Sequence, residues 1–344
     1  MPASKKRSRV VLQMLMDKEL NQHVDWKRRV FGIGPKMISL PASRMVHPSS
    51  PFAQGVVLVS SLLLMYTAIV TPFLIAFFWH WDTCNMLATL PFDMFIDSFF
   101  LAEIVFAFFV GTTVNGQYVD DWKQVAWTYA SGMLFFDLFT SIPVSYLEFL
   151  NAQACRESGG QGGDNRLRFV RLLKPLRLFK LMRSFKALQL VEVLDDLEQW
   201  LRLPPFMFRM VRVFGIVMYV VHVFTCGWWL IKVVSNEPEK MADWYSQYVI
   251  DMGSQDDSDS AWSTDGVVGG RAVFHQYVLS MYYINTVFST VGFGDIQAQN
   301  SVERIFSMVA MYAGTVVFGT LLSEVENSVA QLRRYCMYVL LMCC

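Results

Sequence analysis

Long apolar segments alternate with short polar ones along most of the chain, and this pattern predicts a membrane protein. A helix needs about 20 apolar residues to cross the hydrocarbon core of a bilayer. Six segments meet that length: 52–79, 92–110, 125–150, 165–187, 206–234 and 302–329. A shorter apolar helix, 274–288, is expected to enter the membrane and return before the last span. We therefore expect an all-α membrane protein.

Composition and charge agree with this class. Of the 344 residues 54% are hydrophobic, and the net charge is zero. Such a chain is too apolar for an ordinary soluble enzyme, and its terminal segments hold no catalytic constellation. Residues 1–50 are basic and carry no signal peptide, so the positive-inside rule keeps them in the cytosol. With an even number of spans both termini are cytosolic. We expect a multi-pass protein of the plasma membrane, with lipid and no nucleic acid as its partner.

The fourth predicted span carries a regular row of cations. They recur at every third position: Arg168, Arg171, Lys174, Arg177, Lys180, Arg183 and Lys186. A step of three residues drifts slowly around a helix, so the charges form a stripe. A basic helix on the membrane surface would spread its charges over a broad polar face. Charges inside a bilayer are costly and mark function, so the stripe predicts a voltage sensor.

Acidic residues in the preceding spans are the candidate partners of these cations. Asp97 and Glu103 lie in the second span and Asp137 in the third. Phe100 shares a helix face with Glu103, because the two are three residues apart. This arrangement resembles the charge-transfer centre of voltage sensors, with Phe100 as the aromatic plug and Asp97 as the outer partner. Phe99 is an alternative plug.

A short polar stretch separates the re-entrant helix from the last span. It reads Thr290, Val291, Gly292, Phe293, Gly294 and Asp295. It resembles the selectivity filter of potassium channels, in which backbone carbonyls of four chains replace the water around a cation. The two glycines permit the unusual backbone angles that this requires. Thr290 is expected to add its hydroxyl as the innermost ligand, and Asp295 to brace the outer mouth.

Residues 46–330 resemble six-span voltage-gated potassium channels of the ether-à-go-go, cyclic-nucleotide-gated and plant Shaker-like group. Further matching stretches are 137–144 and 222–229. The resemblance implies a homotetramer, or a heterotetramer with related subunits, and K⁺ as the permeant ion with no other metal or cofactor. It implies a cytosolic segment (1–50), a sensor (51–187), a linker (188–205), a pore domain (206–330) and a cytosolic tail (331–344). The group usually continues with a cyclic-nucleotide-binding domain; these residues contain none, so no nucleotide is expected to act on this chain.

The last span offers candidate gate residues. Gly314 and Gly319 permit bending, and Leu322 and Val325 are suited to an apolar constriction that closes by dewetting. Small residues also favour ordinary helix packing in membranes, and both roles are compatible.

Several other features leave alternatives open. His222 and Cys226 have the spacing of metal ligands, but packing against the re-entrant helix is favoured. The acidic loop 235–272 is expected to be a flexible turret rather than a calcium site. A disulfide between Cys84 and Cys155 is allowed by their compartment. Phe293 lacks the hydroxyl that commonly braces a filter, which leaves filter stability open.

The leading hypothesis is a voltage-gated potassium channel opened by the fourth helix. The alternatives are a weakly selective or hyperpolarisation-activated cation channel, and a regulatory subunit that needs full-length partners. A voltage-sensing enzyme is disfavoured by the presence of the filter.

Overall fold

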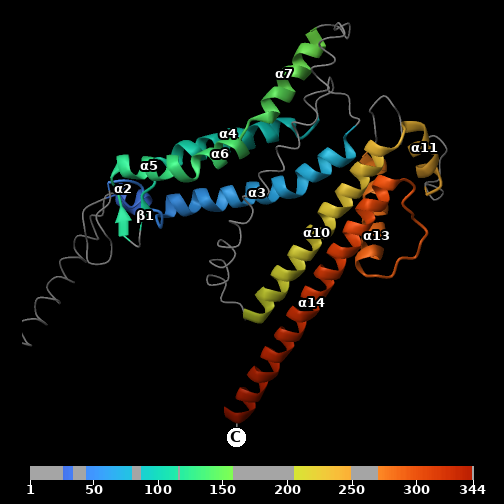
Figure 1. Ribbon diagram of the computed structural model, residues 1–344. Helices are drawn as coiled ribbons and strands as arrows, with labels where there is room; N and C mark the ends of the chain where they lie inside the picture. The colour runs from blue at the N-terminus through green and yellow to red at the C-terminus, as the bar shows by residue number, and fades with distance from the viewer. Residues whose placement is uncertain are drawn as a thin grey trace, which may run out of the picture. The chain divides into compact units, whose positions relative to one another are not determined.

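The computed structural model describes residues 26–33, 44–79, 87–114, 117–157, 205–248 and 270–342, which are largely helical (Figure 1). The predicted fourth span with its seven cations lies outside these residues, as do nearly all of the linker and Cys84. The described chain forms two compact units. One comprises Met1–Leu64 with Ala88–Tyr146, and the other Met65–Leu87 with Leu147–Cys344.

The first unit is built mainly from helices of the predicted sensor, together with α2 of the preceding segment. It holds α2 (Trp26–Phe31), the start of α3 (Pro51–Phe77), α4 (Leu90–Ala107), α5 (Trp122–Gly132) and α6 (Leu134–Thr140). The Ser50 hydroxyl caps α3 by accepting the amide of Ala53 at 3.3 Å. Proline in the first turn of α4 costs nothing there, because that amide has no partner in a helix.

A hairpin of β1 (Thr112–Val114) and β2 (Gln117–Val119) separates α4 from α5. The strands are antiparallel, with Val114 opposite Gln117. The two residues between them are Asn115 and Gly116, the pair that most favours two-residue hairpins. The sequence therefore carried a signal for this hairpin that the search for long apolar segments passed over.

The predicted third span, 125–150, is helical but is not one unbroken helix. The segment is divided into α5, α6 and α7 (Val144–Glu157), and the helix axes bend by 59° after α5. Gly132 ends α5, and glycine has a low helix propensity. Pro143 follows α6 and removes a donor while disfavouring the helical conformation at Ile142. These two residues explain both breaks.

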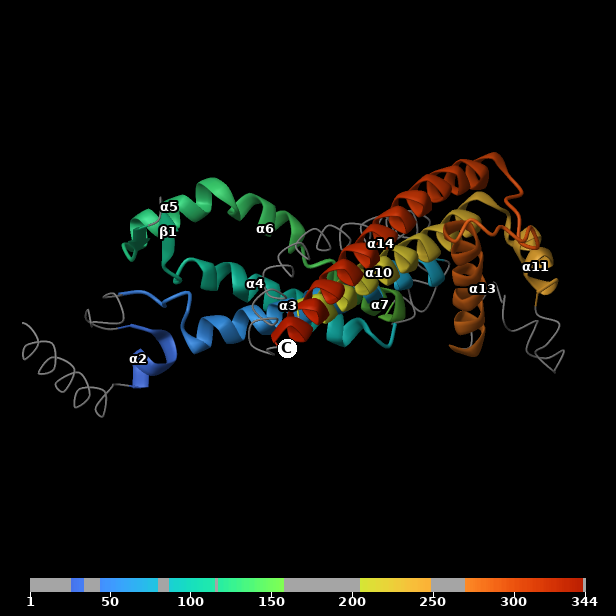
Figure 2. The same cartoon turned by 90° about the horizontal axis from the view of Figure 1, so that it is seen from below.

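The second unit contains the three helices that flank the filter stretch. α10 (Pro205–Ser235), α13 (Gly270–Phe288) and α14 (Ser301–Met342) pack against one another (Figures 1 and 2). The fifth span and the re-entrant helix are thus confirmed as helices, and α13 ends at the predicted residue. The core between them is aromatic: Trp228 stacks on Tyr283 at 4.1 Å, and Trp229 stacks on Phe77 at 5.4 Å.

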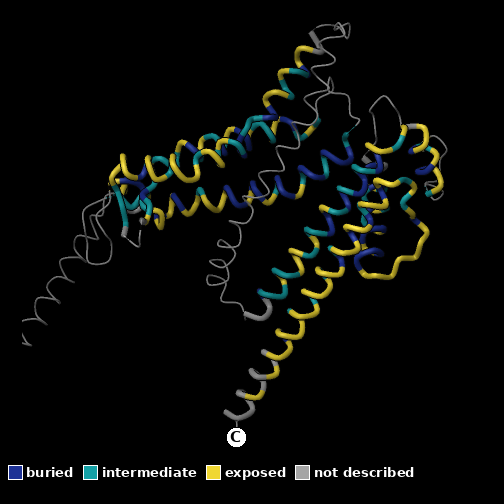
Figure 3. The backbone as a smooth tube through the Cα atoms, viewed as in Figure 1, coloured by how far each residue is buried: buried dark blue, intermediate teal, exposed yellow. Residues whose placement is uncertain are grey.

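Two further boundaries differ from the predictions. The start of the acidic loop is not a flexible turret, because α11 (Pro238–Ser246) buries Met241, Trp244 and Tyr245 in the aromatic core. The last helix continues without a break from Ser301 to Met342, well beyond the expected end of the span. Many of its residues are exposed in the single chain (Figure 3).

The described helices include three that are long and apolar enough to cross a membrane, and four if the bent pair counts as one. They are Pro51–Phe77, Phe208–Ser235 and Ser301–Ala330, with Trp122–Gly132 and Leu134–Ala154 as the bent pair. The second predicted span is helical as α4, but three carboxylates lower its apolar character.

Candidate functional site

Backbone hydrogen bonds attach the filter stretch to the end of α13. The carbonyl oxygen of Thr286 accepts the amides of Val291 at 3.1 Å and of Gly292 at 3.0 Å. The amide of Thr290 is donated to Val287 at 3.1 Å. These bonds reverse the chain direction at the helix end and fix the stretch as an ordered loop.

Backbone angles in this loop alternate in hand. Thr290, Gly292 and Gly294 have φ of 60°, 54° and 78°, whereas Val291 and Phe293 between them keep negative φ. Alternating left- and right-handed residues turn successive carbonyls toward one side of the chain instead of opposite sides. Thr290 is the one residue other than glycine with positive φ in the described chain. The sequence predicted the role of the two glycines but not the conformation of Thr290.

Tyrosine hydroxyls brace the outer end of the loop. Tyr282 of α13 donates to the Asp295 carboxylate at 2.7 Å, and Tyr248 donates to the Asp295 carbonyl at 2.9 Å. The Phe293 ring stacks on Tyr282, with centroids 6.4 Å apart and planes 3° from parallel. Tyr283 bonds instead to Ser307 of α14 at 2.8 Å. The hydroxyl that Phe293 lacks therefore has counterparts on neighbouring residues.

Tyr245 in α11 and Tyr248 just after it stay protonated over a wide pH range. Burial raises the pKa of Tyr245 to about 12. Burial, together with the negative charge of Asp295, raises the pKa of Tyr248. Both therefore keep a proton to donate, Tyr248 to the carbonyl of Asp295.

The loop after Asp295 leads to a buried ion pair that the sequence did not predict. Lys232 of α10 lies 3.1 Å from the Glu303 carboxylate of α14, and both side chains are 0% exposed. The Asn-x-x-Glu pattern at 300–303 precedes an apolar run and is a capping signal, so Glu303 was detectable. Its partner, 71 residues earlier, was not.

His222 joins three helices of the second unit. Its Nε2 lies 2.8 Å from the carbonyl oxygen of Ile69 in α3, so this nitrogen carries the proton. Its Nδ1 accepts from the Tyr277 hydroxyl of α13 at 2.9 Å. Both ring nitrogens are engaged in packing contacts, which supports the packing interpretation over metal binding.

The predicted counter-charges occupy distinct places in the first unit. Asp97 is fully buried and accepts the amide of Ser145 at 3.0 Å, so it caps α7 at the break made by Pro143. Asp137 accepts a hydrogen bond from the Tyr129 hydroxyl at 2.7 Å. Phe100 is buried at 1% exposure, whereas Phe99 is half-buried.

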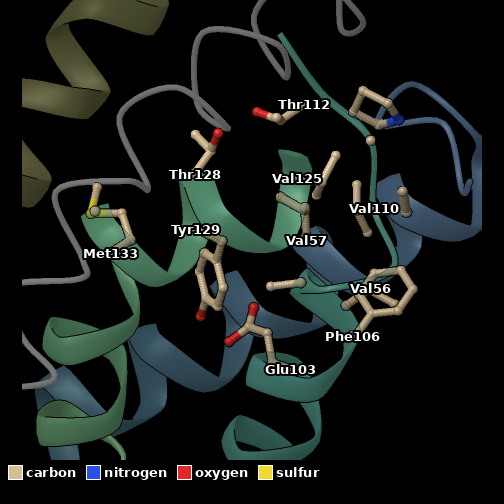
Figure 4. A pocket seen from close by; sticks show the side chains of 15 residues that line it. Val56, Val57, Glu103, Phe106, Val110, Thr112, Val125, Thr128, Tyr129 and Met133 are labelled. Carbon is tan, nitrogen blue, oxygen red and sulfur yellow. The ribbon is translucent and has the colours of Figure 1, made fainter. Parts of the chain in front are cut away.

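Glu103 lines a cavity of about 550 Å³ between α3, α4 and α5. The walls are mainly apolar, and the Tyr129 hydroxyl is turned toward the Glu103 carboxylate (Figure 4). Asp137 and Glu103 thus flank the same tyrosine from different helices. Tyr129 is a member of this site that the sequence analysis missed.

The candidate gate residues separate into two kinds. A Cβ on Gly314 would lie 2.8 Å from Cα of Phe288, the last residue of α13, so this glycine permits close helix contact. A Cβ on Gly319 would meet nothing within 4 Å. Leu322 and Val325 are exposed on α14 in the single chain. The helix is unbroken at all four positions, which supports the packing interpretation for Gly314.

Comparison with known proteins places this geometry in a family. The model of the family described as "Ion transport protein" matches residues 54–335. The chain belongs to the ion transport protein family. Ion transport proteins of this kind are channels rather than enzymes, and with the apolar helices this makes the chain a multi-pass membrane protein.

Named relatives within the ion transport protein family are potassium channels. The chain is 25% identical over 270 residues to "Potassium channel AKT1" of Oryza sativa subsp. indica, covering 78% of this chain and 25% of the relative. It is 27% identical over 284 residues to the human "Voltage-gated delayed rectifier potassium channel KCNH5", covering 79% and 26%. It is 24% identical over 286 residues to the "Voltage-gated inwardly rectifying potassium channel KCNH6" of Gallus gallus, covering 79% and 21%. The chain thus spans about a quarter of the length of these relatives.

Proposed function

We propose that this chain is a subunit of a potassium channel and contributes one quarter of a K⁺-selective filter. The observation that carries the proposal is the alternation of backbone hand at Thr290, Gly292 and Gly294. A loop with this alternation presents a ladder of carbonyl oxygens, the ligands that replace the hydration shell of K⁺. The names of the relatives support potassium as the ion.

Assembly with further copies, or with related subunits, would cover apolar surface that is exposed in the single chain. Val291 and Phe293 are 56% and 69% exposed, although both are apolar. Large apolar side chains are exposed along α14, among them Val302, Ile305, Met308, Val309, Val316, Phe318 and Val329. Apolar surface of this extent marks a contact with protein or lipid. A tetramer would cover part of it, and lipid the rest.

Voltage would open this channel through the cations at 168–186. In the proposed mechanism, depolarisation drives them outward past Glu103, Asp137 and the ring of Phe100, which act as successive partners. Each charge that crosses the full field contributes ~2.3 kcal/mol per 100 mV, so a few charges in each of four subunits give a steep response. The protein would lie in the plasma membrane with both termini in the cytosol.

A second candidate, a weakly selective cation channel, has one observation in its favour. The Phe293 ring has no hydroxyl, so it cannot brace the filter by a hydrogen bond of its own. A less braced filter deforms more easily and discriminates less between K⁺ and Na⁺. The tyrosine bonds to Asp295 favour the selective channel.

Whole-cell recording from the chain expressed alone tests the proposal. Voltage is stepped in both directions, and the reversal potential is followed as external K⁺ replaces Na⁺. We expect a reversal that follows the K⁺ gradient and current that grows on depolarisation. A reversal indifferent to the exchange would refute K⁺ selectivity. Absence of current despite surface expression would refute a self-sufficient channel and favour a regulatory subunit.

A matched pair of glycine variants ties the current to the filter. Gly292→Ala places a Cβ on a residue with φ of 54°, which costs an L residue about 1–2 kcal/mol. Gly215→Ala adds the same methyl in α10, where it would meet nothing within 4 Å. At equal surface expression, the first variant should lose K⁺-selective current and the second should retain it.

A further inference from the structure

The ion pair of Lys232 and Glu303 is the buried centre of a polar cluster. The Lys232 ammonium lies 4.1 Å from the ring centroid of Trp244 and 5.2 Å from that of Trp228. The cation is thus enclosed by two aromatic rings and one carboxylate, with no exposed surface. Buried cations are seldom kept for stability alone, because desolvation offsets most of the Coulomb attraction.

Glu303 receives hydrogen bonds from four directions. Its Oε2 accepts from Lys232 at 3.1 Å and from the backbone amide of Gln299 at 2.9 Å. Its Oε1 accepts from the side-chain amides of Asn236 at 2.6 Å and of Asn300 at 3.0 Å. All four partners donate a hydrogen bond. A carboxylate can accept bonds at both of its oxygens, whereas a glutamine in its place would set its own NH2 donor against some of these partners. We call Lys232, Asn236, Asn300 and Glu303 the Glu303 cluster.

The position of the cluster links it to the filter. Gln299 and Asn300 end the loop that leaves the filter at Asp295, and Asn300 caps α14 by accepting the amide of Glu303 at 2.8 Å. The other end of the loop is held at Asp295 by Tyr282 and Tyr248. The loop is therefore fixed at both ends, to α13 and to Tyr248 just after α11 on one side and to α10 and α14 on the other.

We propose that the Glu303 cluster is a positioning device that holds the outer loop of the filter and sets how long the filter stays conductive. The inference rests on the proposed channel function. The carboxylate acts through the Gln299 amide and Asn300 rather than by touching the ion. Loss of the cluster would free one end of the loop and let the filter carbonyls leave their common axis.

Sustained depolarisation measures this role directly. We expect Lys232→Met and Glu303→Gln to accelerate the decay of current about tenfold, equivalent to ~1.4 kcal/mol in the barrier. High external K⁺ should slow the decay again, because occupied carbonyls resist rearrangement. Lys240→Met is the matched control: it removes an ion pair with Glu237 at 2.9 Å whose side chains are 69% and 73% exposed. Its decay should equal that of the unaltered chain.

A charge exchange separates position from electrostatics. The double variant with Lys232→Glu and Glu303→Lys keeps the pair but places an ammonium beside the Gln299 amide, which has a hydrogen to donate and cannot accept one. We expect no rescue, and the current should decay as fast as in Glu303→Gln. Full rescue by the exchange would overturn the positioning role, because the pair alone would then suffice.

Hydrogen exchange of the purified full chain in lipid nanodiscs gives a readout independent of current. Peptides covering 296–304 should exchange at least tenfold faster in both single variants, while α13 stays protected. Unchanged exchange would overturn the proposal, as would a loosened loop with unaltered decay. Absence of K⁺ current in the unaltered chain would refute the proposed function instead, and exchange alone would then decide whether the cluster holds the loop.

Discussion

Replacing Gly314 by alanine tests whether this glycine permits packing or bending. The added methyl carbon would lie 2.8 Å from Cα of Phe288 and 3.1 Å from two atoms of its ring. Carbon atoms in contact prefer separations of about 3.5–4.0 Å, so the end of α13 must move by several tenths of an ångström or more. Because Phe288 lies two residues before Thr290, this shift would reach the filter.

The magnitude follows from two opposing terms. Overpacking a tight contact costs about 1–3 kcal/mol. Alanine gains about 1 kcal/mol over glycine in a helix interior. Gly314→Ala should therefore lower the free energy of unfolding by about 0–2 kcal/mol.

Gly319→Ala provides the control on the same helix. It gains the same helix propensity, but its Cβ meets nothing within 4 Å in the chain. The difference between the two variants cancels the propensity and leaves the packing cost of about 1–3 kcal/mol. The assay is thermal unfolding of purified protein in detergent, with the same variants recorded for current. If both variants melt at the same temperature, the packing argument is wrong and a bending role for Gly314 regains support.

Three further predictions concern individual hydrogen bonds and one titration. Tyr282→Phe removes the donor to Asp295 and should accelerate the decay of current by up to about tenfold. Tyr219→Phe is the control, because the Tyr219 hydroxyl makes no hydrogen bond among the described residues, and its decay should not change. Equal decay in both variants would contradict the bracing role. His222→Leu should destabilise the purified protein by about 1–3 kcal/mol, measured by thermal unfolding, because leucine removes the donor to the Ile69 carbonyl and the acceptor of the Tyr277 hydroxyl. Burial raises the pKa of Tyr245 from 10.0 to about 12 in the folded protein, so its contribution to stability is complete below pH 10 and is lost as pH rises from 10 toward 12. Thermal unfolding across that range should show a fall that is smaller in the Tyr245→Phe variant.

Most helices were predictable because membrane spans are fixed by local composition. The first and fifth spans and the re-entrant helix follow from apolar length alone, and α13 ends where the polar stretch begins. The breaks in the third span were not predicted, although Gly132 and Pro143 were visible. Apolar length was weighed above the backbone chemistry of those two residues, and the chain broke where they stand.

The candidate filter shows which backbone conformations short sequence patterns can predict and which they cannot. Gly292 and Gly294 predict a left-handed backbone, because glycine alone adopts it without strain. Thr290 adopts the same conformation at a cost, and nothing in its side chain predicts this. The bonds from Val291 and Gly292 to Thr286 hold it there, and they exist only once α13 is in place.

The sequence by itself therefore determined the class of protein, most of its helices and the two glycines of the candidate filter, since these depend on length, hydrophobicity and glycine content within short windows. The tertiary structure decided which residues hold the filter in shape. Lys232 and Glu303 are 71 positions apart, and Ile69 and His222 are 153 apart. No local pattern encodes such pairs, because a buried hydrogen bond or ion pair is favourable only when packing brings both partners together and excludes water.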